Sequence, residues 1–454
     1  MTPVITFPAD ASGRPSSSAF GRSVVADALR AVSPAAADAA ARESDWRRGY
    51  LRHFRELVAA GATDGYEIAA AGLASVQERM PVPVEPAAGP LEVITVEGGE
   101  KPTREVAIPY RGELLRGAAL DRQLDRWVTA GVIEDSAAEA VRAVAAHPDW
   151  LDLTDQQLVV LGAGAEMGPL PAVLEWGATV IGVDLPRVEE RISALAAKSA
   201  GRLIIPRGVD LLADIGPLAH WLAERPAGRL TVGNYVYAPG AAYPRLSIAV
   251  DALVAYLQGV RNDVALAFLA TPTDVFAVPP SAVAQSAERF ERRSRAARVT
   301  AALSGGRLLQ PNYAGDNIND SLVPQQGPNY AIAKRIQRWR ATLARRDGVV
   351  SFSVAPPART KSVVANRILA AAYAGAHLFD VEVFEPDTAN RLMAVLMVHQ
   401  LRNPRPAAAE AWQDEAIGAA HGGLWRTAYH PRTALGLAAV RGFMPPRGSA
   451  PRQP

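Results

Sequence analysis

The stretch Leu158-Val-Val-Leu-Gly162-Ala-Gly164-Ala-Glu-Met-Gly168 decides the fold, because an apolar strand runs directly into a glycine-rich turn. A glycine at position 162 permits a tight turn, since it carries no side chain. We expect the turn to open a helix whose N-terminal N–H groups and dipole can hold a pyrophosphate. The residues predicted to line this dinucleotide site are Gly162, Gly164, Met167 and Gly168.

A second apolar strand ends at Asp184, 16 residues after Gly168. A carboxylate at this place can accept hydrogen bonds from both adenosine ribose hydroxyls, and it would repel a 2′-phosphate. The position favours NAD over NADP, although Arg187 lies close enough to soften that preference. The alternative is that the glycines only make a tight βα turn and that Asp184 caps a helix.

The region around this turn alternates strands and helices, which predicts an α/β fold. The pattern begins at about residue 151, and strands are expected at 157–162, 179–184, 202–206, 229–235, 263–270 and 349–354. Such alternation is typical of a parallel sheet covered on both faces. We expect a doubly wound, Rossmann-like domain over 151–380. Flanking it, we expect a mainly helical region over 1–150, with a β-hairpin made by 91–96 and 105–110, and a helical extension over 381–454 that ends in a disordered tail.

The composition excludes several classes of protein. The 454 residues contain no cysteine, so disulfides, cysteine-ligated zinc, iron–sulfur clusters and thiol catalysis are ruled out. The formal net charge of +2 does not indicate binding to nucleic acid or to a membrane. No uncharged apolar run is long enough to span a membrane, and the first residues lack the pattern of a secretory signal, so we expect a cytoplasmic protein.

The histidines do not predict a metal site. None of the seven falls in an HxxxH or HExxH pattern, and His421 and His430 are far apart from each other. A structural or surface role is expected for both residues.

The segment Tyr330-Ala-Ile-Ala-Lys334 supplies a second chemical signal downstream of the glycine turn. On a helix, side chains at i and i+4 lie on one face, so the ammonium of Lys334 can lower the pKa of the Tyr330 phenol. A phenol prepared in this way can transfer a proton. A nucleotide fold followed by such a pair suggests hydride transfer.

With these motifs the chain resembles the short-chain dehydrogenase/reductase family over roughly residues 155–380. The resemblance rests on four places: the turn at 162–168, Asn234 after the fourth strand, the Tyr330/Lys334 pair, and Val354-Ala-Pro-Pro-Ala-Arg-Thr360. It implies a nicotinamide cofactor, NAD or NADP, with Tyr330 as general acid/base and Lys334 holding the ribose. It also implies that Thr360 contacts the nicotinamide end of the cofactor. Further residues assigned to the cofactor site are Asn234, Pro356 and Asp210.

The sequence departs from the family pattern in several places. Glu166 replaces the middle glycine of the turn, and only Asn234 remains of an Asn-Asn-Ala-Gly stretch. The catalytic serine after the fifth strand is missing, and Thr271 or Thr273 is expected to orient a substrate carbonyl instead. Asp251 is expected to occupy the place of the helical asparagine that completes the family's proton relay.

A long insertion lies between the two expected catalytic positions, since 59 residues separate Thr271 from Tyr330. Its layout resembles that of ketoreductase domains in large fatty-acid synthases. The segment 276–328 should border the substrate cleft. It is either a lid whose arginines, or whose Asn317 and Asn319, contact an anionic or polar substrate, or a solvated charged helix that docks on a partner subunit.

Together these features predict an NAD(P)-dependent oxidoreductase that acts on the carbonyl, alcohol or imine of a medium-sized organic substrate. Two alternatives stay open. One is a redox-inactive dinucleotide-binding scaffold or sensor, and the other is a non-redox epimerase, dehydratase or cyclase on the same fold. The expected partners are a small-molecule substrate and, from the resemblance, further copies of the chain in a homo-oligomer.

Overall fold

The computed structural model describes residues 5–85, 90–213, 215–226 and 228–443. The tail for which disorder is expected begins at Pro445 and therefore lies outside the described residues. Within the described part of the chain, no helix has both the length and the apolar character that a membrane span requires.

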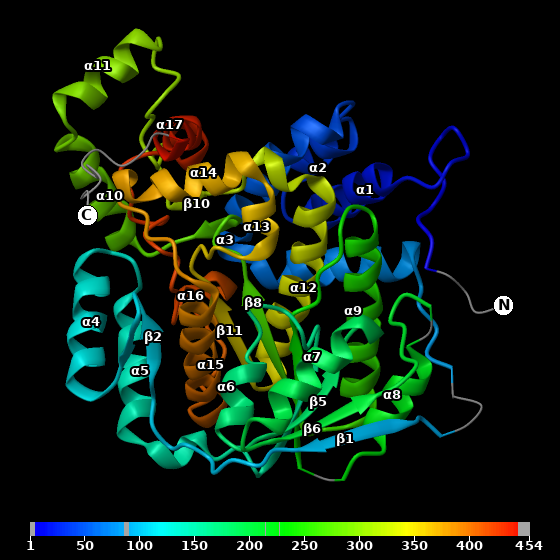
Figure 1. Cartoon of the computed structure of the whole chain (residues 1–454). Coiled ribbons are helices and arrows are strands. Elements are labelled where there is room, and N and C mark those ends of the chain that lie inside the picture. The colour runs from blue at the N-terminus through cyan, green and yellow to red at the C-terminus, as the bar shows by residue number, and fades with distance from the viewer. Residues whose placement is uncertain (1–4, 86–89, 214, 227, 444–454) are drawn as a thin grey trace.

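A seven-stranded sheet forms the centre of a mixed α/β, Rossmann-like structure (Figure 1). The strand order is β1-β6-β5-β4-β7-β8-β11, and all pairs are parallel except β1 with β6. The chain changes direction across the sheet between β4 and β7, and ligands of open α/β sheets bind at the carboxyl ends of strands beside such a point. The strands are β1 (Val93–Glu97), β4 (Gln156–Leu161), β5 (Thr179–Val183), β6 (Arg202–Pro206), β7 (Arg229–Asn234), β8 (Val264–Ala270) and β11 (Val350–Val354).

The six strands predicted from the sequence are all present, and each end lies within one residue of the predicted one. Their side chains point alternately to two apolar cores. On β4, Leu158 and Val160 face one core, while Val159 and Leu161 face the other. Helices flank the sheet on both of these faces. The first face is covered by α5 (Asp135–Ala146), α6 (Leu170–Glu175), α7 (Pro186–Ala197) and α15 (Pro386–Arg402), and the second by α8 (Gly216–Ala223), α9 (Ala242–Val260) and α12 (Pro328–Asp347).

The β-hairpin expected from 91–96 and 105–110 does not form. The first run is β1, which pairs antiparallel with β6 at the edge of the central sheet. The second run instead supplies β2 (Ile108–Tyr110), which pairs with β3 (Glu113–Leu115). The two residues between them, Arg111 and Gly112, have φ of 50° and 84°. Positive φ at both positions is the geometry of a tight type I′ hairpin turn, which fixes this pairing.

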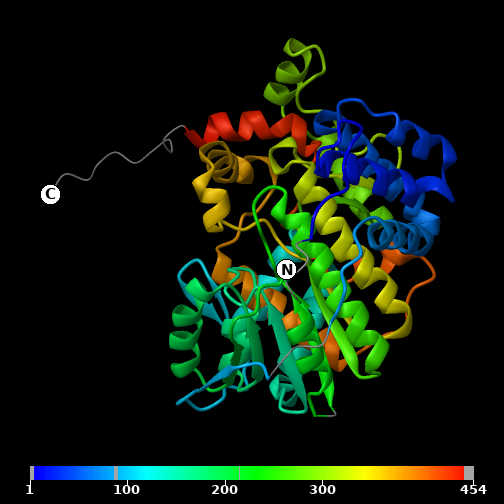
Figure 2. The ribbon, with the colours of Figure 1, turned by 90° about the vertical axis from the view of Figure 1, so that its right-hand side faces the viewer.

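The N-terminal helices build a third apolar core against α12, above the sheet in Figures 1 and 2. The insertion contributes an antiparallel strand pair and two helices at the same end of the molecule. The remaining elements are α1 (Ser17–Arg30), α2 (Pro34–Ala41), α3 (Trp46–Arg79), α4 (Gly117–Thr129), β9 (Val275–Ala277), α10 (Pro280–Glu291), α11 (Arg295–Leu303), β10 (Ile318–Asp320), α13 (Lys361–Ala365), α14 (Arg367–Gly375), α16 (Ala411–Ala416) and α17 (Pro431–Phe443).

Candidate functional site

Tyr330 and Lys334 lie in the first turns of α12, the helix that leads back from the insertion to the last parallel strand. Gly327 precedes this helix with a φ of 78°, and Pro328 occupies its first position, where a missing N–H costs nothing. The Tyr330 ring packs against Tyr243 on α9, with 5.5 Å between the ring centroids. Tyr237 lies 6.4 Å from the Tyr330 ring and 5.3 Å from Tyr243, so the three rings form one cluster.

The structure brings the two expected threonines to Tyr330. The Thr271 side chain, one residue after β8, lies close enough to the Tyr330 phenol to lower its pKa. The hydroxyls of Thr271 and Thr273 lie 3.0 Å apart, and the Gln326 amide donates to Thr273 at 2.9 Å. Gln326, Thr273 and Thr271 therefore form one polar chain beside Tyr330 at the carboxyl end of β8. Sequence reasoning missed Gln326, whose only signal is its place four residues before Tyr330.

Lys334 does not act on the phenol in the expected way. Its Nζ donates to the Leu269 carbonyl at 3.3 Å and to Gln337 at 3.4 Å. Burial lowers the pKa of Lys334 to about 8, and the carboxylate of Asp274 opposes that shift. Burial raises the pKa of Tyr330 well above its ordinary value, and the nearby Thr271 side chain only partly offsets this shift. The expected depression of the phenol pKa is therefore absent, because the ammonium turns toward β8 and the phenol lies among other tyrosine rings.

Asp251 does not join the proton relay for which it was predicted. Its buried carboxylate accepts the Arg340 Nε at 2.7 Å. Arg340 follows Tyr330 by ten residues on α12, which corresponds to about 15 Å along a helix. The Asp251–Arg340 ion pair joins α9 to α12, and its role is structural.

The glycine turn follows β4 as predicted, but it does not open a helix. Gly162 has a φ of 82°, and a Cβ there would lie 2.7 Å from the Tyr235 carbonyl oxygen, so only glycine fits. Turns continue to residue 169, and the short helix α6 begins only at Leu170. The prolines at 169 and 171 explain the delay, because a helix that began at the turn would carry both in its interior.

Asp184 lies beside the turn, at the end of β5, as predicted. Its two carboxylate oxygens accept the backbone N–H groups of Gly164 and Leu185, each at 2.7 Å. Arg191 donates to the Gly164 carbonyl at 2.7 Å, and a Cβ at Gly164 would lie 2.4 Å from its guanidinium. Asp184 therefore holds the turn together, while each oxygen keeps a second lone pair for a ligand. Arg187 is exposed on α7 nearby.

Glu166 reaches out of the turn to a different segment. Its carboxylate accepts the N–H of Lys361 at 2.8 Å, and the Asn390 amide donates to its backbone carbonyl at 3.1 Å. Within the described residues, the backbone N–H groups of Glu166 and Met167 donate to no protein atom. A phosphate could therefore bind these two N–H groups, and a ribose could bind Asp184. The residues present thus fit a dinucleotide, although its phosphate would lie close to the Glu166 carboxylate.

The remaining predicted cofactor residues lie along the same carboxyl edge of the strands. Asn234 ends β7, and its side-chain oxygen accepts the Val236 N–H at 3.4 Å. Asp210 is exposed after β6 and accepts the Leu212 N–H at 2.8 Å. Two further positions follow β11, namely the buried Pro356 and Thr360, whose hydroxyl lies 3.1 Å from that of Ser362.

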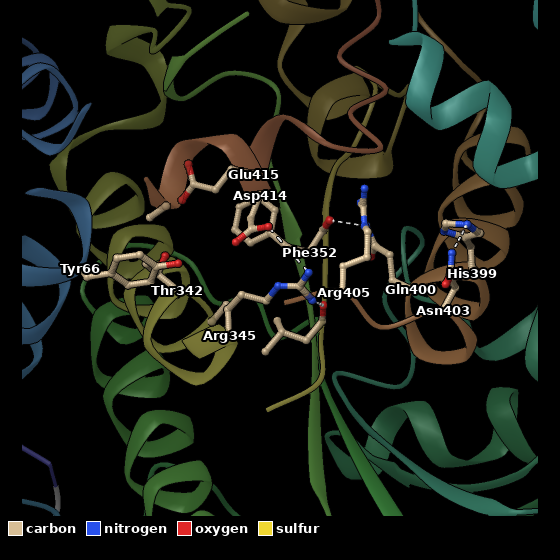
Figure 3. A pocket seen from close by; sticks show the side chains of 13 residues that line it. Tyr66, Thr342, Arg345, Phe352, His399, Gln400, Asn403, Arg405, Asp414 and Glu415 are labelled. Atoms are coloured by element: carbon tan, nitrogen blue, oxygen red, sulfur yellow. Dashed lines mark hydrogen bonds and ion pairs between the residues drawn. The ribbon is translucent and has the colours of Figure 1, made fainter. Parts of the chain in front are cut away.

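One cavity lies at the opposite edge of the sheet (Figure 3). Its walls include Val350, the first residue of β11, and Arg345, which lies 3.7 Å from Asp414. Its volume of about 30 Å³ has room for only a few water molecules. Since Thr271 follows the carboxyl end of the neighbouring strand β8, this cavity is separate from the Tyr330 site.

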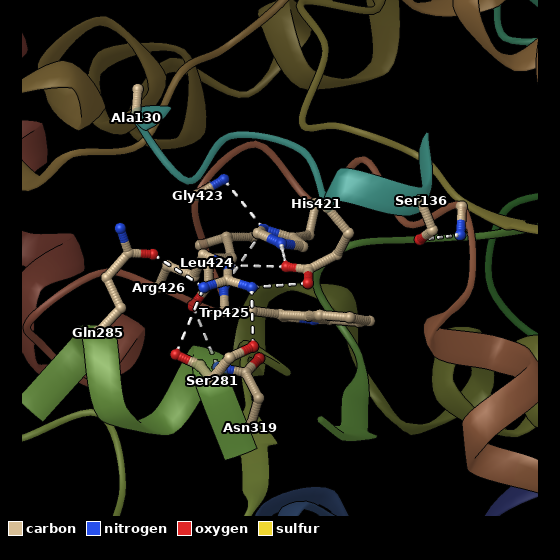
Figure 4. A network of polar contacts seen from close by, with 12 residues as sticks. Ala130, Ser136, Ser281, Gln285, Asn319, His421, Gly423, Leu424, Trp425 and Arg426 are labelled. Atoms are coloured by element: carbon tan, nitrogen blue, oxygen red, sulfur yellow. Dashed lines mark hydrogen bonds and ion pairs between the residues drawn. The ribbon is translucent and has the colours of Figure 1, made fainter. Parts of the chain in front are cut away.

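His421 is fully buried in a network of polar contacts (Figure 4). Its Nε2 lies 2.8 Å from the Glu134 carboxylate, which also accepts two hydrogen bonds from Arg426. The network joins the start of α5 to the 421–427 segment, so its role is structural. Among the described residues, no group of three histidine, aspartate or glutamate side chains is placed to hold a metal.

Comparison with known proteins gives no relative: no family model matches the sequence, and neither a characterised protein nor a solved structure is significantly similar to it.

Proposed function

We propose that the protein is an NAD(P)-dependent oxidoreductase with a doubly wound, Rossmann-like catalytic domain. The observation that supports this function best is the proximity of the Thr271 hydroxyl to the Tyr330 phenol at the carboxyl end of β8. Lys334 lies one helical turn further along α12. Two hydroxyls at one point, beside the edge where a Rossmann-like sheet binds its ligands, can hold a carbonyl oxygen and give it a proton.

In this proposal Tyr330 donates the proton when a substrate carbonyl or imine is reduced, and takes it back in the reverse direction. The bound dinucleotide supplies or accepts the hydride. The phenol of Tyr330 is protonated at neutral pH, so the resting site holds the proton that a reduction requires. Thr271 orients the substrate oxygen, while Gln326 and Thr273 hold the Thr271 hydroxyl in place. Lys334, which donates to the Leu269 carbonyl, would reach the ribose with a remaining N–H.

The dinucleotide would be held by residues of the turn and of β5. Asp184 would accept the ribose hydroxyls, and the backbone N–H groups of Glu166 and Met167 would donate to phosphate. Arg187 would pair with a 2′-phosphate, so the proposal includes both NAD and NADP as cofactors.

A second function, nucleotide binding without turnover, is favoured by one contact. The Glu166 carboxylate lies at the turn and accepts the Lys361 N–H, so a negative charge lies next to the expected phosphate position. A protein that binds a nucleotide weakly and senses it would tolerate this arrangement.

Fluorescence titration of the full chain with NADH and with NADPH, followed by a screen of ketones, aldehydes and imines, tests the two functions. We expect micromolar binding of at least one cofactor, and its oxidation with at least one substrate. Binding without any turnover would replace the oxidoreductase with the sensor. The absence of binding to either cofactor would overturn both.

A further inference from the structure

A cavity of about 450 Å³ lies between the β2–β3 hairpin, the segment after β11, α14 and the 380–385 segment. Its volume falls within the roughly 300–1,000 Å³ of small-molecule sites. The partly exposed Tyr110 supplies an aromatic wall, with the Arg111 guanidinium 4.9 Å from its ring centroid, while the buried Phe384 and Trp127 support it from behind. Tyr373 of α14 forms another part of the lining. The cavity therefore offers an apolar surface on which a ring can pack.

The backbone of the cavity is unusual. Among the described residues, three that are not glycine have a left-handed φ: Arg111 at 50°, Leu309 at 54° and Asp380 at 58°. Two of these three line the cavity. The first position of a type I′ turn ordinarily takes asparagine, aspartate or glycine. Arginine disfavours the left-handed backbone conformation that it adopts there. Strained backbone of this kind clusters at ligand sites.

The charged groups of the cavity leave one carboxylate unmatched. Arg111 lies 3.4 Å from Glu382, and Arg359 lies 3.7 Å from Glu385. Asp380 forms no ion pair and accepts no hydrogen bond within the described part of the chain. Among its arginine, aspartate and glutamate side chains, the lining therefore carries two arginines and three carboxylates. Such a lining favours a ligand with a positive charge over its neutral or anionic counterpart.

The cavity is connected to the proposed catalytic group through Tyr373. This side chain lines the cavity and also lies close enough to Tyr330 that its charge raises the pKa of the Tyr330 phenol. A ligand in the cavity would thus contact Tyr373, the lining side chain that is coupled to Tyr330.

We propose that this cavity binds the substrate of the oxidoreductase and that the substrate carries an apolar ring and a cationic amine. The ring packs beside Tyr110 and Tyr373, and the amine pairs with Asp380. The assignment of this ligand as the substrate rests on the proposed function, whereas the preference for a ring-bearing amine can be measured without turnover.

Three probes with a similar skeleton test the preference: 2-phenylethylamine, 2-phenylethanol and phenylacetate. Isothermal titration calorimetry on the full chain at neutral pH should show the amine binding about fivefold tighter or more than the alcohol, with the carboxylate weakest. Asp380→Asn should remove the difference between amine and alcohol, because asparagine tolerates the left-handed backbone and lacks the charge. Asp38→Asn, at an exposed ion pair on α2, is the matched control and should keep the preference.

A second variant keeps the test valid if Asp380→Asn does not fold. Ala374→Phe places a ring in the cavity from α14, and it should weaken the binding of all three probes. Equal binding of the three probes to the native chain, or an unchanged preference in Asp380→Asn, would overturn the proposal. If the chain binds and oxidises NADH but no probe binds, only the cavity proposal fails. If the amine binds as expected and neither cofactor does, the amine site stands and its assignment to the oxidoreductase fails.

Discussion

The carboxylate of Glu166 accepts the backbone N–H of Lys361 at 2.8 Å, although 195 residues separate the two along the chain. The contact ties the turn after β4 to the first residue of α13, beyond the last parallel strand. Both segments are expected to border the dinucleotide, and both are thereby fixed in the absence of a ligand. The contact holds the site in shape, but it also places a negative charge beside the expected phosphate.

Glu166→Gln separates these two effects, because an amide oxygen can still accept the Lys361 N–H while the charge is lost. We expect NADH to bind about fivefold tighter, which corresponds to about 1 kcal/mol for a charge removed near a solvated phosphate. Fluorescence titration measures this. Glu78→Gln, at an exposed position on α3, should leave the affinity unchanged. Weaker binding in Glu166→Gln would mean that the carboxylate assists the cofactor rather than opposing it.

Tyr330→Phe removes only the phenolic oxygen. Turnover with the best carbonyl substrate should fall by about a hundredfold or more, within the usual range for general acid catalysis, while the dissociation constant for NADH stays the same. Steady-state kinetics and a cofactor titration on the same preparation give both quantities. Tyr256→Phe, whose phenol contacts His220 instead, serves as the control and should retain full activity. Full activity in Tyr330→Phe would remove this residue from the mechanism.

Thr271→Val tests the hydroxyl that faces Tyr330. Valine has nearly the same shape, so the change removes the group that lowers the phenol pKa. The phenol should then be a weaker acid, and steady-state turnover should fall about tenfold. Thr271→Ser should restore turnover. Full turnover in the valine variant would show that Thr271 does not act on the phenol.

The sheet could be predicted from the sequence because each parallel strand is a short apolar run followed by a turn signal, as at 158–162. The pairing of Thr271 with Tyr330 follows from the same pattern, because the residue after β8 and the crossover helix that follows the insertion meet at one edge of the sheet. What could not be predicted depends on partners distant in sequence. The turn at Gly162 opens no helix, since two prolines delay it. Asp251 was assigned by its place on a helix, but Arg340, on another helix, decided its role.

The Asp251–Arg340 ion pair should matter for stability and not for chemistry. The side chains of Asp251 and Arg340 are 3% and 17% exposed, and truncating one partner of a buried pair costs about 3–5 kcal/mol. Asp251→Ala should therefore lower the melting temperature clearly, while the folded fraction keeps its turnover at low temperature. Asp38→Ala, at the exposed Arg30–Asp38 pair, should leave the melting temperature almost unchanged. A loss of turnover without a loss of stability in Asp251→Ala would support a role of Asp251 in the proton relay.

The His421–Glu134–Arg426 network of Figure 4 should make the fold sensitive to acid. Burial lowers the pKa of His421 below its ordinary value, so the folded state holds this ring neutral. The unfolded chain binds a proton there as the pH falls below about 6.5, and stability is lost from that point downward. Burial alone would raise the pKa of Glu134, but hydrogen bonds from His421 and Arg426 lower it to about 2. The contribution of Glu134 to the free energy of unfolding is fully present above about pH 4.5 and is lost as the pH falls toward 2.

His421→Gln separates the two steps, because glutamine can still donate to Glu134 and does not titrate. Thermal melts between pH 8 and pH 4 should show the melting temperature of the native chain falling below about pH 6.5, and the variant should lack the part of this fall between about pH 6.5 and 5. The remaining loss, at lower pH, belongs to Glu134 and other carboxylates. His147→Gln, at an exposed histidine, is the control and should reproduce the native curve. A native melting temperature that stays constant from pH 7 to 5 would mean that His421 is protonated as readily in the folded chain as in the unfolded one.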